Sequence, residues 1–354
     1  MKGRRTVLAV LAAACTLGLS AAAVRPARDV VGFCWDRETM NQLVDILQKT
    51  RPLPKAAPGW VAAICPHDDY LYAGRLYLPV YARFKAPEVV IIGVTHGRVR
   101  RALGNPQGRI ILDTHRLWAG LGQPVQISGL REWLDKRLSP EELLVSDKAH
   151  EMEHSIEAMI PFLQHFRPDV RITPIMVTAM SPSRLAELSR ELARHVAAWM
   201  RSRGLQPGRD VVFVISADGN HYGPDFDNAP FGTNRYARTR AEGFERSLIQ
   251  ECLQGKLNRS KLERLQRALN PGLTKNAPLW CGRYSIPFGL MTVLNIVEEW
   301  SGNEQVHGRL LGWSDTWQEG VLPLRHTALG ITAPFSLEHW VSFFSMAFYL
   351  GPMD

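Results

Sequence analysis

The pentapeptide HEMEH, residues 150–154, is one candidate for chemistry in this sequence. It fits the H-E-x-x-H pattern, in which two histidines one helical turn apart hold zinc and the glutamate acts as general base. A zinc protease needs these histidines on the inner face of a buried helix. Here the apolar positions begin only at Ile156, and Glu157 and Ile160 stand where extended zinc-protease motifs carry glycine and histidine. We therefore rank the zinc protease low and expect a solvated helix start, whose acidic residues complement the helix dipole.

A second group of candidates stands where apolar, β-branched-rich runs of the sequence end. The polar residues that follow these runs are His67, His96, Asp218 and His221. If the runs are parallel strands, their carboxyl ends meet at one edge of a sheet, which is where α/β proteins bind ligands. A lone histidine at a strand end is more often a turn residue. Three coinciding strand ends favour a shared metal or acid/base site.

The elements that must position these residues are those of an α/β fold. Four runs are short and nearly continuously apolar, as buried strands are: 60–65, 88–95, 170–177 and 210–216. Apolar periodicity predicts helices over 38–48, 183–199, 235–253, 259–269, 286–300 and 338–350. This alternation predicts a three-layer sandwich with a central, mostly parallel (mixed) sheet flanked by helices. No repeat or long linker divides the chain, so we expect one domain over residues 30–354.

Residues 1–23 have the layout of a secretory signal peptide, with a basic start, an apolar run and a small-residue exit. The adjacent Arg4 and Arg5 would also suit the twin-arginine route, and Cys15 a lipid anchor. We therefore expect a protein that is exported, periplasmic or membrane-anchored by its N-terminus. Outside this segment no stretch reaches the roughly 18 apolar residues that a membrane span needs.

Composition limits the classes of function. With 45% hydrophobic and 21% charged residues, the 354-residue chain can bury a full core. The formal charge is +8, but the basic residues form no cluster with interleaved aromatic side chains, so we expect no nucleic-acid partner. Beyond residue 23 the cysteines are Cys34, Cys65, Cys252 and Cys281. None forms a C-x-x-C pair, which excludes a zinc ribbon or a dithiol redox motif.

Five motifs carry a resemblance to a known family. They are PHDDYLYAG, GVTHG, EHSIEAMIPFLQHF, SADGNHYG and CGRYSIPFG. In this order and approximate spacing they resemble the Memo family, also called AmmeMemoRadiSam system protein B, over roughly residues 57–334. The resemblance implies a fold similar to that of class III extradiol dioxygenases, which use non-haem iron. Bacterial members of the family accompany a radical-SAM protein, so the resemblance also implies radical-SAM system proteins as partners.

The resemblance implies a metal site of two histidines and one cysteine, which match His67, His96 and Cys281. Two neutral imidazoles and a thiolate suit a divalent metal; we expect iron, with copper or zinc as alternatives. Three protein ligands leave positions open for water, oxygen or substrate, as in catalytic metal sites.

The other motif residues are expected around that site. By the resemblance Asp218 and His221 line the pocket, where His221 would act as general acid/base and Asp218 would orient an imidazole or contact the metal. Glu153 and His154 match the family's Glu-His element. They would contact the metal ligands without binding the metal themselves, which makes the HEMEH match accidental. We also expect substrate contacts from Tyr70, Tyr72 and Arg283, with packing or ion pairing as the alternative.

Three functions compete at this stage. The first is a metal-dependent, extradiol-dioxygenase-like enzyme acting on a small molecule or peptide. The second is a non-catalytic metal- or peptide-binding scaffold, since one fold hosts many functions. The third is a hydrolase in which Cys281 is the nucleophile and His67 or His221 the base. The family pattern has Ala-Gly where this chain has Asp68 and Asp69, so the substrate stays open.

Overall fold

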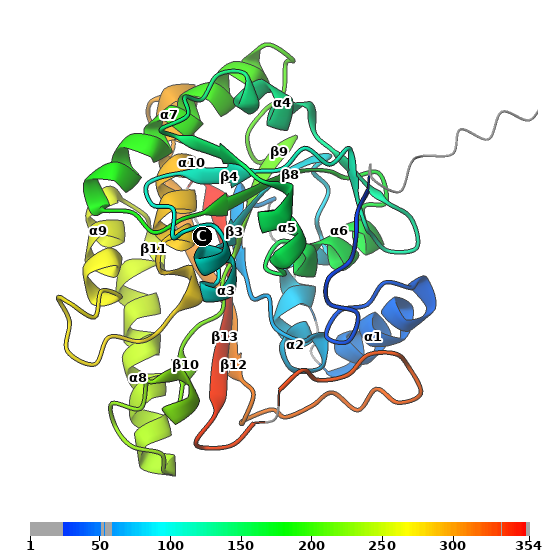
Figure 1. Ribbon diagram of the computed structural model, residues 1–354, viewed down its shortest axis with the longest axis vertical. Helices are drawn as coiled ribbons and strands as arrows, with labels where there is room; N and C mark the ends of the chain where they lie inside the picture. The colour runs from blue at the N-terminus through cyan, green and yellow to red at the C-terminus, as the bar shows by residue number, and fades with distance from the viewer. Residues whose placement is uncertain (1–23, 51–52, 54–58, 334, 352–354) are drawn as a thin grey trace, which may run out of the picture.

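A mixed β-sheet lies at the centre of the computed structural model, which describes residues 24–50, 53, 59–333 and 335–351 (Figure 1). Four neighbouring strands at the middle of the sheet run parallel. In spatial order they are β8 (Arg171–Val177), β3 (Glu88–Val94), β9 (Val211–Ser216) and β2 (Ala62–Cys65). They coincide with the four predicted apolar runs. Nearly all of their residues are buried, as expected for strands covered on both faces.

Shorter and antiparallel strands complete both sides of the sheet. Beyond β8 lie β6 (Val125–Ile127), β5 (Leu117–Trp118) and β1 (Val24–Arg25). Beyond β2 lie β13 (Trp340–Leu350), β12 (Val306–Asp315) and β11 (Gly255–Lys256). Off this path, β4 (Ile110–Leu112) pairs with β7 (Leu143–Val145) and β8, and β10 (His221–Tyr222) pairs with β13. The sheet is therefore mixed, with a parallel centre.

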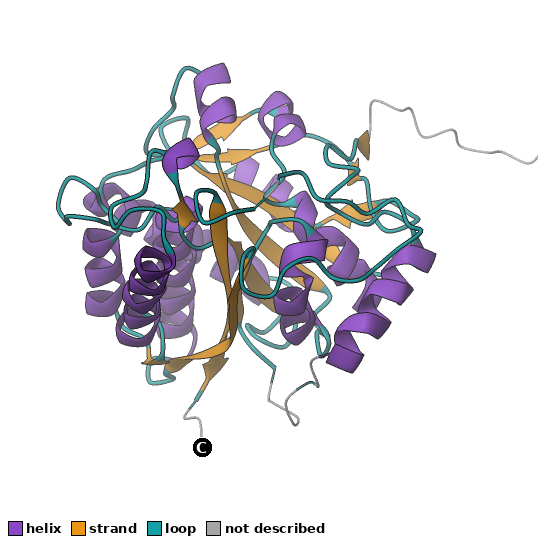
Figure 2. Ribbon diagram, turned by 90° about the horizontal axis from the view of Figure 1, so that it is seen from below, coloured by secondary structure: helices purple, strands orange, loops and turns teal. Residues whose placement is uncertain are grey.

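Helices cover both faces of the sheet, so the predicted three-layer α/β architecture is confirmed (Figure 2). One face carries α4 (Gly129–Asp135), α7 (Pro182–Arg201), α8 (Arg235–Cys252), α9 (Arg259–Ala268) and α10 (Ser285–Ser301). The other carries α1 (Arg37–Thr50), α2 (Tyr70–Tyr81), α5 (Asp147–Met152) and α6 (Ile160–Phe166). Short helical segments are α3 (Gly97–Ala102), η2 (Glu157–Met159), η3 (Pro224–Phe226) and η4 (Cys281–Arg283).

Successive side chains of the central strands pack alternately into two hydrophobic cores, one on each face of the sheet. Along β2, Ala62 and Ile64 pack into the core beneath α7 and α10, whereas Ala63 and Cys65 pack into the core beneath α1 and α2. Successive side chains of a strand point to opposite faces, so a strand between two helical layers has to be apolar at every position. This is why the strands appear in the sequence as continuous apolar runs.

The helix predicted over 338–350 is wrong, because this segment is strand β13. It pairs with β2 on one side and with β12 on the other, and its residues are buried on both faces. Its run WVSFFSMAFYL shows neither a helical nor a strand period. Short apolar runs of this kind are decided by tertiary pairing, and the aromatic side chains favour the pleated sheet.

The expectation of an exported, periplasmic or N-terminally anchored protein is corrected. Within the described part of the chain, no helix is long and apolar enough to cross a membrane. The predicted signal peptide, residues 1–23, lies outside the described residues. Nothing in residues 24–351, as far as they are described, supports export.

Candidate metal centre

Three of the predicted site residues meet at the carboxyl ends of β2, β9 and β3. His67, Asp218 and His96 each stand two residues beyond the last residue of their strand. Cys281 arrives from elsewhere in the chain, at the start of η4, and places its Sγ 3.5 Å from Nε2 of His67. One donor atom from each of His67, His96 and Cys281 lies within 4.8 Å of the others. The structure therefore brings together the three side chains that the sequence suggested as ligands.

Hydrogen bonds hold His67 in one tautomer. The Ser216 hydroxyl donates to the carbonyl oxygen of Ser155 at 2.6 Å, so it can only accept at the 2.7 Å contact with Nδ1 of His67. Nδ1 therefore carries the proton, and Nε2 presents its lone pair to the Cys281 side. The ring is 1% exposed, and burial lowers the pKa of His67 well below its usual range. A neutral imidazole with a free Nε2 is what a metal ligand requires.

Asp218 connects the strand end of His67 with Cys281. Its Oδ1 accepts the His67 amide at 2.8 Å, and its own amide donates to the Cys281 sulfur at 3.1 Å. Oδ2 lies 3.3 Å from Nε2 of His67. Burial raises the pKa of Asp218 to about 7. A carboxylate oxygen beside an imidazole lone pair requires a proton or a cation between them, so this contact fits a cation-binding site.

Glu153 orients His96 from the segment that follows α5. Its Oε1 accepts from Nδ1 of His96 at 2.7 Å, and its Oε2 accepts the His96 amide at 2.9 Å. The amides of His154 and Ser155 also donate to this carboxylate. Although burial raises the pKa of Glu153, the His96 charge and these hydrogen bonds hold it well below its usual range. Because Glu153 holds the proton on Nδ1, Nε2 is the nitrogen of His96 that can become a second donor when the ring is neutral.

His154 packs against both ligand histidines. Its ring stacks on His96 with centroids 4.7 Å apart and meets the edge of His67 at 5.4 Å. Burial, followed by the His96 charge, lowers the pKa of His154 to about 4. Together with His96 and Glu153 it forms a second group of potential donors within 4.8 Å of one another. It also borders a cavity of about 740 Å³ on the side of residues 28–31.

The HEMEH segment does not form the helix that a zinc protease needs. Helix α5 ends at Met152, so His150 and His154 do not share a helical face. His150 is fully buried, and its Nε2 contacts the carbonyl oxygen of Ile111 at 3.1 Å. The expected solvated helix start is also wrong, since the chain leaves the helix at Glu153 and continues through η2 into α6. The interruption turns Glu153 and His154 toward the strand ends.

A cavity of about 170 Å³ lies beside two of the three side chains, His96 and Cys281. Its lining also includes His221 from β10. Burial, followed by the His96 charge, lowers the pKa of His221 to about 4, so this imidazole is neutral at neutral pH. The apolar part of the wall consists of Val94, Phe226, Leu279 and Trp280. A neutral imidazole in such a wall can accept a hydrogen bond from a bound molecule, but a pKa of about 4 makes it a weak base.

Two arginines line the same cavity. Arg283 was a sequence candidate, whereas Arg100 was missed, although it stands four residues after His96 and so one turn along α3. Burial and then the Arg283 charge lower the pKa of Arg100. In the described part of the chain neither forms an ion pair with a carboxylate. The cavity wall is therefore cationic.

The two tyrosines suggested as substrate contacts lie in packed surroundings. Tyr70 is fully buried, and its hydroxyl donates to the carbonyl oxygen of Ala158 at 2.6 Å. Tyr72 donates to the carbonyl oxygen of Ala333 at 3.0 Å and meets the ring of Phe335 edge-on. Neither lines the cavity beside Cys281. The geometry matches the packing role that was the alternative for both.

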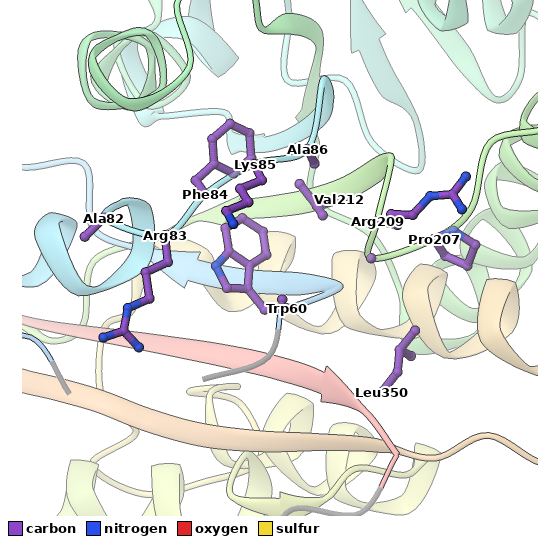
Figure 3. A pocket seen from close by; sticks show the side chains of 12 residues that line it. Trp60, Ala82, Arg83, Phe84, Lys85, Ala86, Pro207, Arg209, Val212 and Leu350 are labelled. Atoms are coloured by element: carbon purple, nitrogen blue, oxygen red, sulfur yellow. The ribbon is translucent and has the colours of Figure 1, made fainter. Parts of the chain in front are cut away.

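A larger cavity, about 680 Å³, lies at the opposite end of the sheet (Figure 3). It borders the amino ends of β2, β3 and β9, with Trp60 and Phe84 among its apolar side chains and Lys85 and Arg209 among its basic ones. Among its described lining residues there is no histidine, cysteine or carboxylate. The side chains able to bind a metal therefore gather at the carboxyl ends of the strands, as expected for parallel sheets.

Comparison with known proteins agrees with this geometry. A family model described as Memo-like protein matches residues 34–298, a span that contains His67, His96 and Cys281. The chain belongs to the Memo-like family. Its resemblance to that family, first drawn from five short motifs, is confirmed. The matched span ends before β12 and β13, which complete the sheet beyond β2.

Several relatives carry the Memo family name. A MEMO1 family protein of Aquifex aeolicus is 33% identical over 194 residues, which are 53% of this chain and 64% of the relative. One from Thermotoga maritima is 32% identical over 204 residues, 54% of this chain and 64% of the relative. One from Methanosarcina barkeri is 31% identical over 166 residues, 46% of this chain and 56% of the relative. The chain thus spans less than two thirds of each of these Memo proteins.

Proposed function

We propose that this Memo-like protein is a metal-dependent enzyme whose centre is a divalent metal held by His67, His96 and Cys281. The observation that carries the proposal is the orientation of the donor atoms. Ser216 and Glu153 accept hydrogen bonds from Nδ1 of His67 and of His96, respectively. This leaves Nε2 of each neutral ring to face the site that also contains the Cys281 thiol. Outer partners of this kind fix the tautomer and direction of metal-binding histidines. Two imidazoles and a thiolate fit iron(II), with copper or zinc as alternatives.

The open side of this centre faces the small cationic cavity. A bound metal would supply Lewis-acid activation there and, as iron, redox chemistry with oxygen. Arg100 and Arg283 would bind and orient a substrate with anionic character, and the apolar wall would exclude water. His221, neutral at the cavity wall, would accept a hydrogen bond from the substrate, while Asp218 holds the His67 backbone and the Cys281 sulfur in place. This arrangement suits chemistry resembling extradiol cleavage. The family resemblance is the ground for proposing radical-SAM system proteins as partners.

The hydrolase alternative is less well supported. Burial and then the Asp218 charge raise the pKa of Cys281 well above its usual range. A thiol nucleophile needs the opposite shift, because the thiolate is the reactive form. Nε2 of His67 lies beside Cys281 and carries no proton, because the proton is held on Nδ1. Even so, the low pKa of His67 makes it a weak base for removing the thiol proton. Metal binding would reverse the preference at Cys281, since a coordinating thiol is deprotonated.

Metal content and turnover test the proposal together. The full chain would be purified anaerobically and its bound metal measured, beside H67A, H96A, C281A and the control H165A, a histidine on α6. We expect the metal content of H67A, H96A and C281A to be lower by about one ion per chain than that of the parent chain and H165A. Oxygen consumption with a panel of catechols then separates enzyme from scaffold. A metal content in H67A, H96A and C281A equal to that of the parent chain would overturn the site, and metal binding without turnover of any tested compound would favour the scaffold.

A further inference from the structure

A second cluster of potential metal ligands lies at the carboxyl ends of β4 and β7 and shares no residue with the centre described above. The two strands are parallel, with Leu112 paired to Val145. Asp113 follows the first strand directly, His115 comes two residues later, and Asp147 stands two residues beyond the second strand. One donor atom from each of the three lies within 4.8 Å of the others. Sequence reasoning did not single out any of them.

His115 supplies an independent sign of a missing partner. Its side chain is 7% exposed, and among the described residues its Nε2 atom has no hydrogen-bond partner. The closest charged group is Glu151, whose Oε1 lies 3.3 Å away but outside hydrogen-bond geometry. A buried polar atom without a partner costs free energy, so native structures seldom leave one. A cation within reach of Nε2 would satisfy it.

The carboxylates around this imidazole are held in place by other groups. Asp113 accepts from Nε1 of Trp118 at 2.6 Å and from Arg131 at 2.8 Å. Asp147 accepts from the amide and the hydroxyl of Thr114 at 2.6 and 2.8 Å. Each carboxylate oxygen keeps a second lone pair after these bonds. Outer partners that fix ligand carboxylates in this way are typical of built metal sites.

The charges of the cluster also favour a cation. The cluster contains three carboxylates, those of Asp113, Asp147 and Glu151. Arg131 forms an ion pair with Asp113, and His115 lies beside Glu151. Donor atoms of Asp113 and Asp147 lie within 4.8 Å of each other, and carboxylates this close repel one another unless a proton or a metal ion lies between them. Glu151 is 45% exposed and sits one helical turn after Asp147, where it can close the site from the solvent side.

We infer that Asp113, His115 and Asp147 bind a second divalent metal ion, with Glu151 as a fourth donor. One imidazole and carboxylate oxygens, without a thiolate, form a harder donor set than the Cys281 centre and suit zinc or manganese. The ion would join the tips of β4 and β7 to α5. Because α5 leads directly into Glu153, the ion would also stabilise the segment that orients His96.

Zinc titration of the full chain, after removal of metal with a chelator, tests this inference. We expect about two zinc ions per parent chain and about one in H115Q/D147N; D147N keeps an oxygen that can accept from Thr114. The control D169N alters an exposed carboxylate paired with Arg167 and should keep both ions. Equal stoichiometry in the parent chain and in H115Q/D147N would overturn the second site.

If H115Q/D147N fails to fold, cobalt(II) binding to the parent chain and to C281A tests the same inference. Only the Cys281 centre can produce a thiolate-to-cobalt charge-transfer band, since the second cluster contains no sulfur. We expect the unmodified chain to take up two cobalt ions, of which one contributes to this band. In C281A the band should disappear while one ion still binds. Binding of a single cobalt ion, entirely accounted for by the thiolate band, would contradict the inference.

Discussion

Oε1 of Glu153 lies 2.7 Å from Nδ1 of His96, while the other oxygen of the same carboxylate accepts the His96 amide at 2.9 Å. The carboxylate thus accepts hydrogen bonds from both the ring and the backbone of a residue 57 positions away in the chain. These hydrogen bonds depend on the break between α5 and η2, because in a continuous helix Glu153 would not lie beside the end of β3. One irregular turn therefore decides which nitrogen of His96 can bind a metal.

Replacing this carboxylate should weaken metal binding. In E153Q one oxygen is replaced by an NH₂ donor, which cannot accept from both the ring and the amide of His96. We expect the affinity for iron(II) or zinc to fall roughly 10- to 100-fold, the usual effect of removing an outer partner of a metal ligand. Competition with a chelator of known affinity measures it. E132Q, at an exposed pair with Lys136, is the control, and equal affinities of E153Q and the parent chain would contradict the proposed role.

Ser216 should matter for the same reason at His67. S216A removes the hydroxyl that accepts from Nδ1 and leaves a buried N–H without a partner. We expect the free energy of unfolding of the metal-free chain to fall by about 1–3 kcal/mol. Urea unfolding followed by circular dichroism measures the loss. S247A, whose exposed hydroxyl bonds within α8, should change stability little; a loss in S216A no larger than in S247A would count against the tautomer argument.

Glu245 should make the stability depend on pH. It is fully buried behind the loop of His221, where it accepts from Trp313, Ser342 and the Asn220 amide. Burial raises its pKa from 4.5 to about 7. In the unfolded chain the group ionises above about pH 4.5, whereas in the folded chain it stays protonated until about pH 7. The Glu245 contribution is therefore fully present below pH 4.5 and declines up to about pH 7.

Urea unfolding between pH 5 and pH 8 tests this dependence. The free energy of unfolding of the metal-free chain should fall with rising pH, by at most about 1.4 kcal/mol per pH unit from this group. E245Q cannot ionise, so its decline should be shallower over the same window. Parallel curves for E245Q and the parent chain would show that Glu245 titrates at its ordinary pKa.

A buried ion pair should make the first described strand essential for stability. Arg25 of β1 pairs with Glu157 and donates to the carbonyl oxygens of His150 and Glu153. R25M leaves the Glu157 carboxylate buried without a counter-ion, at an expected cost of about 3–5 kcal/mol. Adding E157L to R25M should recover part of this loss. Thermal unfolding of the two variants checks the difference, and a double variant less stable than R25M alone would contradict it.

The central sheet was predictable because burial on both faces leaves a local signature. Strands β2, β3, β8 and β9 are continuously apolar and end in polar residues, so their positions and the residues at their tips follow from the sequence. Strand β13 is equally apolar but was predicted as a helix. Its identity depends on pairing with β2 and β12, which are distant in the chain, and local periodicity does not report such contacts.

By itself the sequence determined that His67, His96 and Asp218 would stand at strand ends and that Cys281 belongs to a family motif. Tertiary structure alone decided which nitrogen of each histidine is free, because Ser216 and Glu153 reach them from other segments. It also placed Arg100 in the cavity wall, Tyr70 in the core, and Asp113 beside His115 and Asp147. Hydrogen bonds and charge depend on distance in space, whereas a sequence pattern records only order along the chain.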